Sequence, residues 1–294
     1  MPKLSEFPMG WVNYVLGISD VLIFFVFLPV HVAVCWVLFK NRFFSEQPVY
    51  TLLCQLLIAN IIGLISTIGA GIFELAGTEL FLHLNVTMAA LALWYRHIYS
   101  TLTLFLSINR LSWITSIAIP YEKDFYKYFF FALWFAFTVL IMFANYVRLN
   151  IGYNFEVNGF SYFTEKAQSE NAFPDYVYTM AMLMLSSFTY GIAAAAVIRC
   201  KCFNLYIDPE EYGVFVQLIA IFVPKMLMRF SRHVLLVYCP NSGLLQVNIF
   251  LYRIVPALNI CSLPYQNKRL RECTFCLVSL LRKKRSAQIG TLPS

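Results

Sequence analysis

Long apolar runs recur along this chain and constrain its fold more than any other feature. The first extends from Val15 to Phe39, and six more follow, separated by polar segments. About 20 apolar residues in a helix cross the hydrocarbon core of a bilayer, and a helix satisfies its backbone polar groups internally there. The pattern predicts an all-α membrane protein, a bundle of seven transmembrane helices.

The composition agrees with lipid as the main solvent. Hydrophobic residues make up 60% of the chain and charged residues 13%, whereas about a quarter of the residues in soluble domains are charged. One core of this size cannot bury all 28 Phe and 18 Tyr side chains. The net charge of +7 gathers near the C-terminus beside apolar residues, which indicates a membrane surface rather than nucleic acid.

We expect one membrane domain over residues 1–265 and a basic tail over 266–294. The tail has apolar residues at helical spacing among its cations, which predicts an amphipathic helix lying on the membrane surface. The longest segment between spans, residues 148–175, is expected to be a polar loop. The spans are expected at about 17–39, 49–72, 88–112, 128–147, 176–198, 213–235 and 243–265.

Lys and Arg are distributed unevenly over the segments between these spans, which predicts the orientation. With the N-terminus outside, the inner segments carry 14 Lys and Arg residues and the outer segments carry three. Cytoplasmic segments of membrane proteins are enriched in these residues. The N-terminus is therefore expected outside and the tail inside, in a multi-pass protein of the plasma membrane.

Residues that could carry enzymatic chemistry are missing from the sequence pattern. The four His and eight Cys residues have no metal-ligand spacing, and there is no glycine-rich phosphate loop. Asp20 is the one carboxylate expected inside a span, so an intramembrane protease would lack its second acid. We expect neither an enzyme nor a bound metal or cofactor.

Several cations in or near the expected spans form a candidate ligand site. Burying a charge in hydrocarbon is costly unless it meets a partner, a wet cavity or the interface. Lys225 and Arg229 lie four residues apart and share a helical face. One interpretation is an outward-facing pocket for a small anionic or strongly hydrogen-bonding ligand; the others are snorkelling, or structural ion pairs with Asp20, Glu74 or Glu79. The expected pocket residues are Arg96, Tyr99, Lys225, Arg229, Tyr252 and Arg253.

Two smaller features concern packing and modification. Gly69 and Gly71 are expected to allow close helix packing. Asn85-Val86-Thr87 is an acceptor sequence for N-glycosylation, but it adjoins the third span. Its use is left open.

The segment after the third span resembles a known family. Asn109-Arg110, followed by Pro120-Tyr121-Glu122-Lys123, looks like the nematode serpentine chemoreceptors, nearest the gamma and v classes. Leu263-Pro264-Tyr265, followed by basic residues, is similar to the end of the seventh span in that family. More distantly, Asn109-Arg110 resembles the acid-Arg-Tyr motif of rhodopsin-like receptors, with Asn109 in place of the acid.

The resemblance implies a G-protein-coupled receptor that binds an environmental or pheromone-like small molecule outside and signals to a heterotrimeric G protein inside. It also implies sensory-neuron cilia as the location. Arg110 is expected to face the cytoplasm within reach of that partner. An odorant-gated channel subunit and an organic-anion transporter are the alternatives, and the oligomeric state is open. The expected coupling residues are Asn109, Arg110, Tyr121, Lys123, Lys201, Pro264 and Tyr265.

Overall fold

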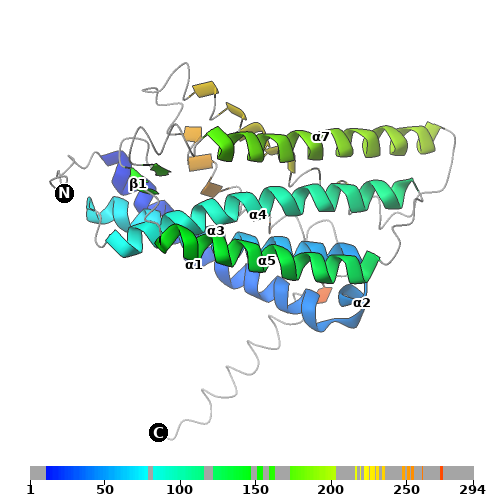
Figure 1. The fold of residues 1–294 in the computed structure, drawn as a ribbon, viewed down its shortest axis with the longest axis horizontal. Helices are drawn as coiled ribbons and strands as arrows, with labels where there is room; N and C mark the ends of the chain where they lie inside the picture. Colours follow the sequence, from blue (N-terminus) through cyan, green and yellow to red (C-terminus); the bar gives the residue numbers. More distant parts are fainter. Residues whose placement is uncertain are drawn as a thin grey trace, which may run out of the picture.

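Long helices running side by side form the protein (Figure 1). The computed structural model describes residues 11–78, 82–115, 122–146, 151–154, 159–162 and 173–202, together with separate residues and short stretches between 216 and 273. Short connections alternate the direction of successive helices. The N-terminal end of α4 therefore lies at the same end of the bundle as the C-terminal end of α3.

The five long helices lie where the first five spans are expected. Helices α1, α3, α4 and α7 contain residues 17–39, 49–72, 88–112 and 176–198, and α5 covers 128–146. The sixth and seventh expected spans are described only in part, by helical residues between 216 and 235 and between 247 and 260. Apart from residues 272 and 273, the tail lies outside the described residues. The long helices are α1 (Trp11–Lys40), α3 (Pro48–Ala76), α4 (Leu82–Ile114), α5 (Glu122–Tyr146) and α7 (Phe173–Cys202).

Local sequence sets the turn between the first two long helices and the end of the second. The short helix α2 (Arg42–Ser45) is capped by Asn41, whose side chain accepts a hydrogen bond from the backbone N–H of Phe43. Pro48 occupies the first turn of α3, where its missing N–H costs nothing. Gly77 ends α3 with a φ of 65°, a left-handed conformation that favours glycine.

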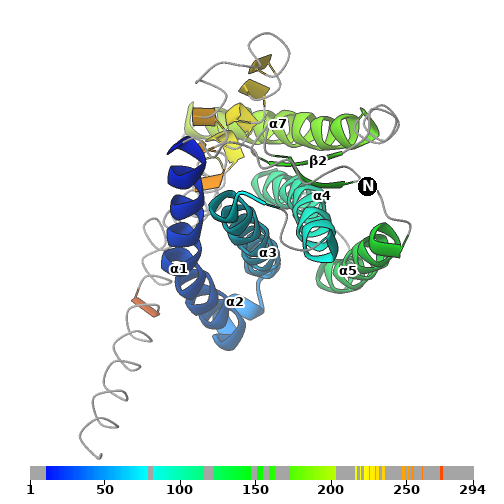
Figure 2. The same ribbon diagram turned by 90° about the vertical axis from the view of Figure 1, so that its left-hand side faces the viewer.

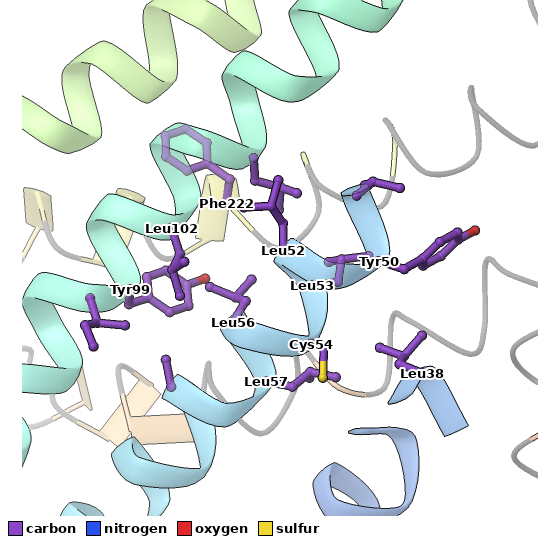
Figure 3. Packing of buried hydrophobic residues seen from close by; sticks show 14 of the residues in the cluster. Leu38, Tyr50, Leu52, Leu53, Cys54, Leu56, Leu57, Tyr99, Leu102 and Phe222 are labelled. Carbon is purple, nitrogen blue, oxygen red and sulfur yellow. The ribbon is translucent and has the colours of Figure 1, made fainter. Parts of the chain in front are cut away.

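Helix α4 occupies the centre of the described bundle. It packs against α3, α5 and α7, while α1 packs against α3 (Figure 2). Tyr99 and Leu102 of α4 meet Leu56 of α3 in the largest group of buried apolar side chains (Figure 3). Because α4 is surrounded by protein, it carries polar residues such as Thr103, whose hydroxyl bonds to the Tyr99 carbonyl at 2.7 Å.

The outer faces of the bundle are apolar, as lipid exposure requires. Phe25 of α1, Phe131 of α5 and Phe188 of α7 are among the large side chains that protein leaves exposed. Within the described residues, three helices are long and apolar enough to cross a membrane: those covering Asn13–Lys40, Pro48–Ala76 and Val177–Arg199.

A short hairpin lies in the segment expected to be a polar loop. Strands β1 (Ile151–Asn154) and β2 (Gly159–Tyr162) pair antiparallel, with Tyr153 opposite Phe160. The expected polar loop therefore contains a short β-hairpin that the sequence did not predict. Four residues per strand are too few for alternation of apolar and polar residues to stand out in the sequence, and burial against the helix ends stabilises the hairpin.

Glycines bring α3 close to both of its neighbours, which confirms the expectation for Gly69 and Gly71. A Cβ atom built on Gly71 would lie 2.8 Å from the Asp20 Cβ and 2.9 Å from the Gly17 carbonyl oxygen of α1. One built on Gly69 would lie 2.7 Å from the Met88 Cγ of α4. The α1–α3 contact is the less tolerant of the two, because a backbone atom cannot move aside as a methionine side chain can.

We predict that Gly71→Ala lowers the stability of the purified protein by about 1–3 kcal/mol, since overpacking forces the backbones of α1 and α3 apart. Thermal unfolding in detergent measures the loss. Gly191→Ala is the matched control, because a Cβ atom at Gly191 of α7 meets nothing within 4 Å. Equal unfolding midpoints for the two variants would contradict the close α1–α3 contact.

Candidate functional site

A buried cluster of charges joins elements far apart in the sequence. The Arg253 guanidinium donates from Nη1 to Asp20 Oδ2 at 2.5 Å and to Glu74 Oε2 at 3.1 Å. Its Nη2 donates to Glu74 Oε1 at 2.9 Å. The exposed fraction of the side chain is 8% for Arg253 and 0% for each acid. The guanidinium therefore links α1 and α3 to the segment that carries residue 253.

The hairpin enters this cluster through Tyr153. The Tyr153 hydroxyl donates to Glu74 Oε1, and its backbone N–H donates to Asn85 Oδ1 of α4 at 2.6 Å. Its ring is fully buried against Phe73 and Phe160. We call Asp20, Glu74, Tyr153 and Arg253 the outer ion cluster, because they lie at the hairpin end of the bundle, which the charge distribution predicts to be outside.

Burial keeps the Tyr153 hydroxyl protonated. Loss of solvent raises the pKa of the phenol well above its ordinary value of 10; the nearby Arg253 opposes the shift and Glu74 adds to it. A phenol that holds its proton remains a hydrogen-bond donor over the physiological range. At neutral and mildly alkaline pH, Tyr153 therefore does not lose the proton that it donates to Glu74.

The geometry of Arg253 matches the structural ion pair that the sequence left open as an alternative. Both terminal nitrogens of its guanidinium already donate to carboxylates. A ligand role for Arg253 stays a prediction, and it would require the ligand to compete with Asp20 and Glu74. Asp20 Oδ1 is buried and has no hydrogen-bond partner in the described structure.

The other expected pocket residues are described only in part. Arg96 is half-buried on α4, and its backbone carbonyl accepts from the Ser100 hydroxyl. Tyr99, one turn further on, is 1% exposed and lies within the core, with its ring edge-on to Tyr95 at 5.7 Å. Tyr99 is therefore a packing residue in this conformation. Lys225, Arg229 and Tyr252 lie outside the described residues.

Asn109 and Arg110 form a second polar site at the opposite end of α4. Arg110 donates from Nε and Nη2 to Asn109 Oδ1, at 3.2 and 2.8 Å. The exposed fraction of Arg110 is 2%, so the expectation that a cytoplasmic partner reaches it directly is wrong for this conformation. The long Arg110 side chain folds back onto the Asn109 amide and into the bundle. The position of Arg110 at the end of a span does not indicate this direction.

The remaining coupling residues cannot be placed around Arg110. Lys123 lies in α5 and Lys201 in α7, but their side chains are outside the described part of the structure. Tyr121, Pro264 and Tyr265 are outside it altogether. Their roles stay predictions.

Sequence reasoning missed Tyr153 and the structural use of Asn85. Asn85 is fully buried, and its Nδ2, the atom that a glycan would modify, is buried as well. This burial is incompatible with a glycan at Asn85 in the folded protein. The available signal for Asn85 was its place as a polar residue in the first turn of a central helix. A polar side chain that is buried there usually has a hydrogen-bond partner from another element.

No protein-family model and no curated protein matches the sequence. Among solved structures, the chain is similar to a crystal structure of squid rhodopsin, with a TM-score of 0.72 over 95% of this chain and 90% of that one. The chain has the rhodopsin fold. It is an all-α, integral membrane protein with the seven-helix bundle of rhodopsin, as the apolar runs predict. The sequence identity of 13% makes this a likeness of fold, and the nematode chemoreceptor class stays a prediction.

We predict that Arg253→Gln destabilises the protein by about 3–5 kcal/mol, because it leaves two carboxylates buried without their cation. Thermal unfolding in detergent and surface expression in cells report the loss. The matched control is the triple variant Asp20→Asn/Glu74→Gln/Arg253→Gln, which removes all three charges and is expected to recover most of the stability. If the single variant Arg253→Gln were as stable as the wild type, the outer ion cluster would not be what holds α1, α3 and the segment with residue 253 together.

Proposed function

We propose that this protein is a G-protein-coupled receptor that binds a small molecule at its outer end and signals to a heterotrimeric G protein at its inner end. The observation that carries the proposal is the match to rhodopsin over 95% of the chain. The placement of Asn109 and Arg110 at the end of α4 opposite the hairpin supports it. The residues after the third span resemble nematode chemoreceptors, and on that resemblance we propose chemosensation in sensory neuron cilia.

Helix α4 offers a direct connection between the two ends. It runs for 33 residues, which corresponds to about 50 Å at the helical rise. Near its start Asn85 holds the hairpin, and near its end Asn109 holds Arg110. A ligand that shifts the outer end of such a helix against its neighbours also shifts its inner end. Ligand binding then favours G-protein binding if both partners prefer the same arrangement of the helices.

The contact between Asn109 and Arg110 suits a switch that opens readily. Asn109 is neutral, and a hydrogen bond to a neutral acceptor is weaker than one to a carboxylate. The guanidinium is held back from the cytoplasm in part by this amide. We propose that activation releases Arg110 from Asn109 and makes it available to the G protein.

We infer the ligand class from the cations that the sequence places toward the outer end. Arg253 already pairs with Asp20 and Glu74. We propose that Arg96, Lys225 and Arg229 attract an anionic or strongly hydrogen-bonding ligand. A small-molecule screen against cells that express the receptor, read out by G-protein activation, tests this ligand class. A response to cationic ligands alone would contradict it.

We predict that Arg110→Ala abolishes G-protein activation at equal surface expression, since the residue that engages the partner is removed. Arg42→Ala is the matched control: Arg42 is also a cation at the inner end, but its side chain is 91% exposed and pairs with Glu46, the residue that follows α2. The control is expected to signal like the wild type. An unaltered response in Arg110→Ala would remove Arg110 from the mechanism.

We also predict that Asn109→Asp lowers ligand-independent signalling several-fold, because a carboxylate holds the guanidinium more tightly than an amide does. Asn109→Ala is expected to raise it. Both changes spare Arg110 itself, and basal G-protein activation measures them without a known ligand. Equal basal activity in both variants would mean that the Asn109–Arg110 contact does not restrain the receptor.

A further inference from the structure

We propose that the outer ion cluster is a binding site for one proton, and that this proton stabilises the packing of α1 against α3. The site goes beyond the proposed receptor function, because it requires neither a ligand nor a G protein. It would make the outer end of the bundle respond to the acidity of its surroundings.

The first support is the charge balance of the cluster. Asp20 Oδ2 and Glu74 Oε2 both accept from the same nitrogen of Arg253, at 2.5 and 3.1 Å. With both acids ionised, the two carboxylates and one guanidinium would carry a net charge of −1, almost fully buried. Two carboxylates that share a site do not readily ionise together, so one added proton makes the cluster neutral.

In the part of the chain that the structure describes, the surroundings of the two acids supply no second cation. Among the described residues, Asp20 faces Glu74 of α3 and Arg253, and Glu74 also accepts from Tyr153 of β1. The residue that α4 contributes beside the hairpin is Asn85, a neutral amide. Within the described residues, a proton from solution is therefore the positive charge that would balance the cluster.

The second support is the unsatisfied oxygen of Asp20. Its Oδ1 atom is buried and lacks a hydrogen-bond partner in the described structure. A bare carboxylate oxygen in such a place is expensive, because nothing replaces its lost hydration. Adding a proton removes the charge and most of this cost.

Close packing favours a proton over a larger cation. Asp20 lies where α1 and α3 approach most tightly: a Cβ atom on Gly71 would be 2.8 Å from the Asp20 Cβ and 2.9 Å from the Gly17 carbonyl oxygen. A hydrated metal ion or an alkylammonium group would have to separate the two helices. A proton needs no such space.

Loss of the proton would act across this same contact. Asp20 belongs to α1 and Glu74 to α3, so repulsion between two ionised carboxylates pushes the two helices apart. Glu74 also holds Tyr153, so the strain reaches the hairpin. At high pH the outer end is therefore expected to loosen, and at low pH to close.

Thermal unfolding of the purified protein in detergent, from about pH 5 to about pH 9, tests the proposal. The folded state would bind a proton that the unfolded chain has released, so its stability rises as the pH falls. We expect the wild-type midpoint to fall by on the order of 5 °C as the pH rises. Asp20→Asn is expected to keep the high, acid-like midpoint throughout, because the amide resembles the protonated acid in shape and charge.

Three comparisons decide between outcomes. Glu74→Gln should flatten the pH dependence as Asp20→Asn does, while His83→Gln, at an exposed histidine of the same end, should leave it as in the wild type. Replacing sodium by choline at constant alkaline pH should not alter the midpoint; a fall would identify a metal ion and overturn the proposal. An undiminished pH dependence in both acid variants would overturn it as well.

An infrared measurement on the wild-type protein detects the bound proton directly. It does not require that any variant folds. The C=O band of a protonated carboxyl is expected at neutral pH and should vanish on alkaline titration. Its absence at both neutral and mildly acidic pH would overturn the proposal. Because no signalling is measured, failure here leaves the receptor function untouched.

Discussion

The contact of Arg253 with Asp20 and Glu74 is the interaction on which the hairpin end of the bundle depends. Taking a guanidinium and two carboxylates out of water is costly, and mutual pairing only partly offsets that cost. The contact therefore specifies an arrangement more than it adds stability. The placement of α1, α3, the segment with residue 253 and the hairpin lets Arg253 meet both acids while Tyr153 reaches Glu74.

The two ends of the bundle hold their arginines in different ways. At the hairpin end Arg253 is held by two carboxylates, and at the opposite end Arg110 is held by the neutral amide of Asn109. Both arginines are charged donors, but a bond to a carboxylate also gains the attraction between opposite charges, which a bond to a neutral amide lacks. Of these two contacts, the one with Asn109 is therefore the more easily broken. Such an asymmetry suits the receptor function that we propose, in which an event at one end of the bundle frees a residue at the other.

Much of the fold could be predicted from the sequence, but little of the site could. The apolar runs placed five helices correctly, because the bilayer leaves helices as the only structure that long apolar segments can form. Arg253 was recognised as an unusual cation, yet its pairing was one of several alternatives. Tyr153 went unnoticed, because a four-residue strand has no distinctive pattern. Arg110 was expected at the surface, since span position alone does not indicate how a flexible side chain folds back.

The sequence by itself determined the solvent, the helices and the predicted orientation, because hydrophobicity and charge act locally and add up along each segment. Tertiary structure alone decided which polar groups meet. Asp20 and Arg253 are 233 residues apart, and their contact depends on how α1 approaches α3 at Gly17 and Gly71. Charges in a low-dielectric interior interact strongly only at a few ångströms. The contacts between the polar groups of this fold were therefore set by packing that no single segment encodes.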